Sequence, residues 1–265
     1  MQDFVHLHVH SQYSLLDGQA SIPRLVDKAI ADGTSGIAIT DHGNMFAIKE
    51  FWNYVKKKNG ARKDKIKDLK SKIEALEKEI ESIEEPATEQ TAELAKMKAE
   101  LDSVPKEDFK AIIGCEVYVA RRGDMLLKEE KADQSGYHLI LLAKNQTGYK
   151  NLIKIVSKAW TDGYYMRPRT DRKELEKYRE GLICCSACLG GEVPKQITNG
   201  NIEAAEEAVQ WYKRVFGEDY YLELQLHKAT VERANHEAYE LQKVVNEKLL
   251  ELSDKFGVGL VCTND

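Results

Sequence analysis

Short β-rich runs alternate with helical stretches along most of this chain, and this order limits the possible folds more than any other feature. Strands are predicted at Phe4–Val9, Gly36–Thr40, Ala111–Val119, His138–Ala143, Gly181–Ser186, Tyr220–Leu226 and Val258–Thr263. Between most of them lie predicted helices at Ile22–Asp32, Gly148–Ala159, Ile202–Phe216 and Val231–Lys255. This alternation is typical of α/β proteins with a largely parallel sheet. About seven such units favour a closed or nearly closed barrel over an open sheet.

One segment, Lys56–Lys110, departs from the alternation. Apolar residues recur there at helical steps of three and four, which is typical of a helix with one apolar stripe. They are Ile66, Leu69, Ile73, Leu76, Ile80 and Ile83, followed after Pro86 by Leu94, Met97 and Leu101. We therefore predict an antiparallel helical hairpin, residues 56–110, inserted between two strands.

The charge of this predicted hairpin is divided along the sequence. Lys56–Lys72 holds nine basic and two acidic residues, whereas Ile73–Glu107 holds four basic and eleven acidic residues. Two helices that neutralise each other would show this division, and so would an arm that docks a partner. We favour cross-pairing between the helices, and neither interpretation makes the hairpin catalytic.

Composition excludes some classes of protein. A content of 42% apolar residues is enough for a buried core. The sequence shows no signal peptide and no apolar run of about 18 residues. The five cysteines have no regular framework spacing, which favours a reducing, cytoplasmic location. A net charge of −5 argues against a protein whose main task is to grip phosphate backbones.

Three of the seven histidines lie in the stretch "FVHLHVHS", where His6, His8 and His10 alternate with Leu7 and Val9. Successive side chains of a strand point to opposite faces, so the three imidazoles would share one face, about 6.5–7 Å apart. Such a row suits a metal site, because neutral imidazole is the commonest metal ligand. For an isolated H-x-H pattern, however, an ordinary polar strand is the more frequent explanation.

Other side chains that can bind metals lie at the ends of the predicted strands. Together with His8 and His10 of the N-terminal stretch, the side chains that could bind metals are those of Asp17, Asp41, His42, Glu116, His138, Cys188 and Asp265. The carboxyl ends of barrel strands share one rim, and only His138 begins its strand instead of ending it. Histidine, carboxylate and thiol donors together favour Zn²⁺, Mn²⁺ or Fe²⁺ over Mg²⁺ or Ca²⁺. This number of donors indicates two or three ions.

Five motifs, in this order, resemble those of the polymerase and histidinol phosphatase (PHP) domain family. They are "HLHVHSQYSLLDG", "AITDHGNMFAIKEF", "IIGCEVYVA", "YHLILLAKNQTGYKNL" and "GLICCSACLGGEVPK". The resemblance is to the version that opens the alpha subunit of bacterial DNA polymerase III, and it covers nearly the whole chain except the hairpin. It implies a distorted barrel of seven parallel strands with surrounding helices and up to three metals at the rim.

The resemblance also implies roles for individual residues. The implied metal ligands are His8, His10, Asp17, His42, Glu116, His138, Cys188 and Asp265. Asp41 is expected to orient His42, and these two residues are the expected catalytic pair, whereas His6 is not expected to be a ligand. The family typically ends its site with a D-x-H pair. Asp265 would be the first member of that pair, so we expect residues 1–265 to be a PHP module cut just before its last ligand.

Three functions remain open at this point. The first is a metal-dependent phosphoesterase module of the replicative polymerase, a nucleotidyltransferase, with 3′→5′ exonuclease proofreading at the primer 3′ end. The second is a silent domain that braces the polymerase and docks partners, and the third is a free-standing histidinol phosphatase. The expected partners are DNA, the remaining polymerase domains and replisome subunits, with no membrane. Arg167 and Arg169 in "YYMRPRTD" are predicted phosphate contacts, with loop solubility as an equal alternative.

Overall fold

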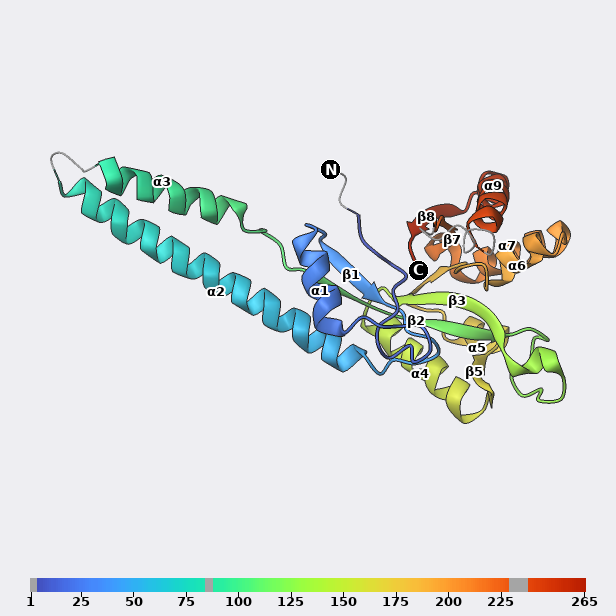
Figure 1. Ribbon diagram of the computed structural model, residues 1–265. Helices are drawn as coiled ribbons and strands as arrows, with labels where there is room; N and C mark the ends of the chain where they lie inside the picture. Colours follow the sequence, from blue (N-terminus) through green and yellow to red (C-terminus); the bar gives the residue numbers. More distant parts are fainter. Residues whose placement is uncertain (1–3, 84–87, 229–237) are drawn as a thin grey trace.

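The computed structural model describes residues 4–83, 88–228 and 238–265, and it shows a curled sheet with helices packed on its outside (Figure 1). The strands are β1 Gly36–Ile39, β2 Lys110–Ala120, β3 Gly136–Ala143, β4 Tyr164–Tyr165, β5 Arg167–Thr170, β6 Leu182–Cys185, β7 Tyr220–Gln225 and β8 Gly259–Thr263. The α-helices are α1 Ile22–Ala31, α2 Ile48–Glu81, α3 Thr88–Ser103, α4 Gln146–Thr161, α5 Arg172–Lys177, α6 Glu192–Thr198, α7 Ile202–Phe216 and α9 Tyr239–Phe256. Two 3₁₀ turns lie at Lys131–Gln134 and Gly217–Asp219. The predicted α/β class and distorted barrel are confirmed.

The sheet is mixed, which corrects the expectation of a largely parallel one at two strands, namely β3 and the two-residue strand β4, which is antiparallel to β5. Its order is β4-β5-β2-β3-β6-β7-β8, with β1 also paired to β2. The pairs β1–β2, β6–β7 and β7–β8 are parallel, but β3 runs antiparallel to both β2 and β6. The connection from β2 to β3 contains only a short 3₁₀ turn, and an antiparallel neighbour can be reached without a crossover helix.

The reversed direction of β3 explains the position of His138. Tyr118 near the carboxyl end of β2 pairs with His138 near the amino end of β3. His138 therefore lies at the same rim as residues that follow the parallel strands, although it begins its own strand.

The segment predicted as the first strand, Phe4–Val9, is not a regular strand. It forms a single bridge, between His6 and Ile37, and its carbonyls at His6 and Val9 accept hydrogen bonds from Ala38 and Thr40. The backbone bends at His8. The segment nevertheless lies along β1 and occupies the place of a first strand. With it, the curled sheet forms a distorted barrel of about seven strands.

Side chains on β2 alternate between the two faces of the sheet. Cys115, Val117 and Val119 pack outward in the large core beneath α4, α7 and α9. Glu116 and Tyr118 alternate with them and therefore point to the inside of the barrel. A small apolar core fills the barrel below the rim, and it comprises Ala38, Ile140, Leu142, Cys185 and Ala187.

The predicted antiparallel hairpin is confirmed, with an earlier start than residue 56. Helix α2 begins at Ile48, and its first turns bury Ile48, Phe51 and Val55 in the core shared with α1 and β1. Beyond this anchored part, α2 and α3 form an arm that projects from the barrel (Figure 1). The break expected at Pro86 and the start of the helix predicted from Val231 lie outside the described residues.

Contacts between the two helices of the arm run in opposite sequence order. Lys65 pairs with Glu100 at 2.8 Å, and Glu77 pairs with Lys98 at 2.6 Å. The helices thus exchange the opposite charges that their sequences supply, as the cross-pairing interpretation predicts. None of the described helices has the length and apolar content that a membrane crossing requires.

Candidate metal centre

The carboxylate of Glu116 lies at the centre of four imidazoles at the rim of the barrel. Its Oε2 atom is 2.9 Å from His10 Nε2, 3.0 Å from His42 Nδ1 and 3.4 Å from His8 Nε2. Its Oε1 atom is 2.7 Å from His138 Nδ1. Glu116 is completely buried, so water does not compete for these contacts. Five residues from four separate parts of the chain therefore share one pocket.

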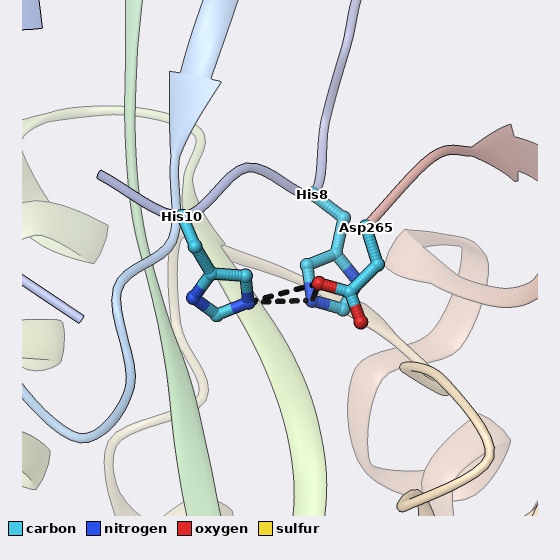
Figure 2. Close-up of side chains that lie close together, drawn as sticks. All are labelled: His8, His10 and Asp265. Carbon is cyan, nitrogen blue, oxygen red and sulfur yellow. Dashed lines mark hydrogen bonds and ion pairs between the residues drawn. The ribbon is translucent and has the colours of Figure 1, made fainter. Parts of the chain in front are cut away.

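His8, His10 and Asp265 form one side of this pocket. Asp265 follows β8, and Figure 2 shows its carboxylate pointing toward the two imidazoles of the N-terminal segment. Asp265 Oδ1 is 3.1 Å from His10 Nε2 and 3.4 Å from His8 Nε2, and the two Nε2 atoms are 3.2 Å apart. This segment and β8 thus meet through side chains at the place where the barrel closes.

Asp17 and Cys188 extend the pocket in two further directions. Asp17 Oδ2 lies 2.9 Å from His42 Nε2, on the solvent side of that ring. Cys188 Sγ lies 3.6 Å from His138 Nδ1 and 3.8 Å from Glu116 Oε1. The donors fall into three overlapping groups with metal-ligand spacing, namely His8–His10–Asp265, His10–Asp17–His42 and His42–Glu116–His138. The structure thus brings all eight predicted ligands together.

The pocket fits divalent ions, because some of its closest atoms do not satisfy one another. Glu116 Oε2 and His42 Nδ1 are buried and 3.0 Å apart, yet neither makes a hydrogen bond of acceptable geometry within the described part of the chain. Buried polar atoms are normally paired, and a carboxylate and an imidazole lone pair that approach each other are both satisfied by a shared cation. The donor set, with imidazole, carboxylate and thiol, matches Zn²⁺, Mn²⁺ or Fe²⁺.

Hydrogen bonds behind the two N-terminal imidazoles orient their rings. His8 Nδ1 lies 2.6 Å from Glu223 Oε1, and a carboxylate only accepts, so Nδ1 donates and the Nε2 lone pair faces the pocket. Ser14 Oγ donates to Asp41 at 2.9 Å, which leaves Ser14 to accept from His10 Nδ1 at 2.8 Å. Outer hydrogen bonds of this kind fix the tautomer of metal-binding histidines.

Asp41 occupies a different place from the one expected. Its carboxylate accepts hydrogen bonds from the Ser11 amide, the Ser11 hydroxyl and the Ser14 hydroxyl, and these do not include the His42 ring. Hydrogen bonds connect the Asp41 carboxylate to His42 through Ser14 Oγ, which accepts a hydrogen bond from the His42 backbone N–H at 3.1 Å. Asp41 therefore shapes the loop that follows the first histidines and acts on His10 through Ser14.

The charges in the pocket change the pKa values of its members in opposite directions. Burial lowers the pKa of His10, but the nearby carboxylates of Asp265 and Glu116 outweigh it and raise the pKa to about 9. Burial raises the pKa of Glu116, but the surrounding imidazoles hold it well below its usual range. Burial and the Glu116 charge raise the pKa of the Cys188 thiol. Without metal, the pocket therefore holds protons that a bound cation would displace.

Three residues discussed from sequence lie outside the pocket. His6 packs edge-on against the Phe4 ring, away from the other two histidines, because of the bend at His8. Arg169 is completely buried and donates to the carbonyls of Gly163, Met125 and Leu127, so its expected contact with phosphate does not fit. Arg167 is exposed and lies at the rim, 6.0 Å from the Tyr118 ring.

A cavity of about 500 Å³ opens directly beside the pocket. His42, His138, Asp17 and Arg167 all line it. A ligand of nucleotide size therefore has access to the donor groups.

Sequence reasoning missed Glu223 and Ser14, the residues that orient His8 and His10. Glu223 is 2% exposed although it carries a carboxylate. The available signal was a charged residue at an inward position of the apolar run "YYLELQ", where an unpaired carboxylate would be costly.

Comparisons with known proteins agree with this arrangement. Residues 6–227 match the PHP domain family. The chain is 38% identical over 262 residues to the DNA polymerase III subunit alpha of Borreliella burgdorferi, which covers 99% of the chain and 18% of the relative. The corresponding protein of Treponema pallidum is 36% identical, covering 99% of the chain and 17% of that relative. That of Aquifex aeolicus is 33% identical, covering all of the chain and 18% of the relative. The chain thus spans less than a fifth of the length of these relatives.

Proposed function

Given that the chain belongs to the PHP domain family, we propose that it is the N-terminal, metal-dependent phosphoesterase module of a DNA polymerase III alpha subunit. Its proposed reaction is hydrolysis of the last phosphodiester at the 3′ end of a DNA primer, which is 3′→5′ exonuclease proofreading. The observation that supports this proposal most is the convergence of imidazoles, carboxylates and a thiol around the buried carboxylate of Glu116. The polymerase relatives support the assignment to this branch of the family.

We propose that three groups of side chains hold two or three ions. His8, His10 and Asp265 would hold one, and His42, Glu116 and His138 another with Cys188 beside them. Asp17 would complete the group that bridges His10 and His42. When bound, divalent metals supply Lewis acidity and a water of lowered pKa, which is the chemistry that phosphoester hydrolysis needs.

The other polar residues would position substrate and protons. His42 faces the cavity and contacts Asp17, which is half exposed, so this pair can exchange a proton with solvent. Asp41, through Ser14, keeps His10 in the tautomer that presents Nε2. Arg167 lines the cavity, where a guanidinium can bind the phosphate oxygens of a substrate.

Most of the affinity for DNA would come from parts of the polymerase outside this chain. Its net charge of −5 supplies little attraction for a phosphate backbone. The proposed partners are therefore the primer 3′ end, the remaining polymerase domains and replisome subunits, in the cytoplasm.

A bracing role is the second candidate, and one observation favours it. The Glu116 carboxylate joins the N-terminal segment, the loop after β1 and the start of β3, and Glu223 joins the N-terminal segment to β7. Such contacts stabilise a barrel whether or not it turns over a substrate.

Elemental analysis followed by a nuclease assay separates the two candidates. The purified chain is loaded with Mn²⁺ or Zn²⁺ and given a single-stranded DNA labelled at its 5′ end. We expect stepwise 3′→5′ shortening that Glu116→Gln abolishes, whereas Glu174→Gln, a buried glutamate on α5, leaves it unchanged. Bound metal without shortening would refute the exonuclease in favour of the bracing role, and a chain that binds no metal would refute the proposed centre.

A further inference from the structure

Three exposed aromatic rings line the same cavity as the imidazoles of His42 and His138. Phe46, Trp160 and Tyr164, here called the aromatic shelf, are 63%, 43% and 48% exposed. The rings of Trp160 and Tyr164 are stacked, with centroids 5.5 Å apart and planes 17° apart. The Phe46 ring lies 6.3 Å from the Trp160 ring and is tilted by 40° to it. Large aromatic rings that line a cavity and remain exposed mark a binding surface.

The aromatic shelf is tied to the metal-binding loop by a hydrogen bond. Trp160 Nε1, at the end of α4, donates to the Gly43 carbonyl at 2.8 Å, and Gly43 directly follows His42. Gly43 has a φ of +61°, and a Cβ there would meet Pro168 and Tyr118, so the turn requires glycine. The indole is therefore held at a constant position relative to the ligand His42.

Backbone strain lies beside the aromatic shelf. Met166 has a φ of +63°, which is unfavourable for a residue with a side chain, and it lies in the turn between β4 and β5. This turn places Tyr164 on one side and Arg167 on the other, both lining the cavity. Strained residues of this kind persist where the surrounding structure holds them, and they gather at ligand sites.

We propose that the aromatic shelf stacks the base of the 3′-terminal nucleotide of a single DNA strand while Arg167 faces its phosphate. The inference rests on the proposed function, which requires the terminal phosphodiester to reach the imidazoles that line the same cavity. The rings, the guanidinium and the metal ligands of this one cavity would then serve the base, the phosphate and the cation. Every base has a π face, so stacking accepts any terminal base, as removal of mispaired ends requires. The cavity of about 500 Å³ has room for one such nucleotide.

A binding experiment tests the aromatic shelf. Two short oligodeoxythymidylates are compared by fluorescence anisotropy in Mn²⁺, one with a normal 3′ nucleotide and one with an abasic 3′ residue. The last linkage of both is a phosphorothioate, which slows hydrolysis. We expect Trp160→Ala to weaken binding of the normal end by about 5- to 150-fold, the range for loss of one stacked base. Binding of the abasic end should already be weak and change little.

Matched variants give this experiment its controls. Trp52→Ala removes a tryptophan that is 52% exposed near the opposite end of β2, and it should bind both probes as the unmodified chain does. Trp160→Phe should retain most of the affinity because it keeps a ring. Equal affinity of the unmodified chain for both ends, or an equal loss of both in Trp160→Ala, would overturn the proposal.

Hydrolysis of bis(p-nitrophenyl) phosphate, which has no nucleobase, reports on the proposed function alone. If this activity is absent but binding depends on the terminal base, the phosphoesterase proposal fails and the aromatic shelf stands. If the activity is present and depends on Glu116, but binding ignores the base, the aromatic shelf alone fails.

Discussion

Replacing Glu223 by glutamine should weaken metal binding without removing any metal ligand. Glu223 Oε1 accepts hydrogen bonds from His8 Nδ1 at 2.6 Å, from Gln225 Nε2 at 2.8 Å and from the Thr263 hydroxyl. Both His8 and Glu223 are buried, so the negative charge behind the imidazole is hardly screened and makes His8 Nε2 a more basic donor. Glutamine keeps the shape but removes this charge. It also introduces amide hydrogens at the position of Oε2, which has no partner among the described residues.

The expected size of this effect follows from the place of His8. Mutation of such an outer partner of a ligand costs roughly 10- to 100-fold in metal affinity, or about 1.4–2.7 kcal/mol. The loss should concern the ion held by His8, His10 and Asp265, because Glu223 contacts none of the donors on the His138 side. Stepwise binding should therefore show one weakened site beside sites of unchanged affinity.

Calorimetric titration of the metal-free chain with Zn²⁺, in the presence of a chelator of known affinity, measures the individual sites. Glu174→Gln is the matched control, since Glu174 is 5% exposed and pairs with Lys158 on α4, away from the pocket. Unchanged affinities in Glu223→Gln, or the same loss in Glu174→Gln, would refute the reasoning.

Three further predictions follow from single residues. The pKa of His10, raised from 6.5 to about 9, stabilises the metal-free chain below pH 6.5, so the free energy of unfolding in urea should fall as the pH rises through 9. A flat profile across this window would contradict the contacts of His10 with Glu116 and Asp265. Cys188→Ser should remove the thiolate charge-transfer band of the Co²⁺-loaded chain and should lower the affinity for Zn²⁺ more than the affinity for Mn²⁺. A retained band would place Cys188 outside the metal centre. Arg169→Met leaves three carbonyls without their donor, which costs about 3 kcal/mol and lowers Tm by roughly 6–12 °C in circular dichroism, whereas an unchanged Tm would contradict the bracing contacts.

The positions of the metal ligands could be predicted because strand ends and local spacing place them at one rim. His8 and His10 lie two residues apart, and Glu116 lies in the second half of a long apolar strand, so spacing and strand assignment together point to a common rim. His138 did not follow this rule, since the direction of β3 depends on the length of its connection and not on the strand's own residues.

Other features depend on tertiary contacts that local patterns do not encode. The alternation of His6, His8 and His10 predicts one shared face, but the bend at His8 turns His6 away. Asp41 and Arg169 are polar residues of ordinary loops in the sequence, and only the fold decides that one binds Ser14 and that the other is buried among carbonyls.

Anomalous diffraction from crystals of the Mn²⁺-loaded chain tests the central claim most directly. The account predicts two or three anomalous peaks at the rim, each about 2.0–2.3 Å from its nearest imidazole or carboxylate donor and within one cluster around Glu116. A map with no peak within bonding distance of His8, His42 or Glu116, from crystals that demonstrably contain manganese, would contradict it.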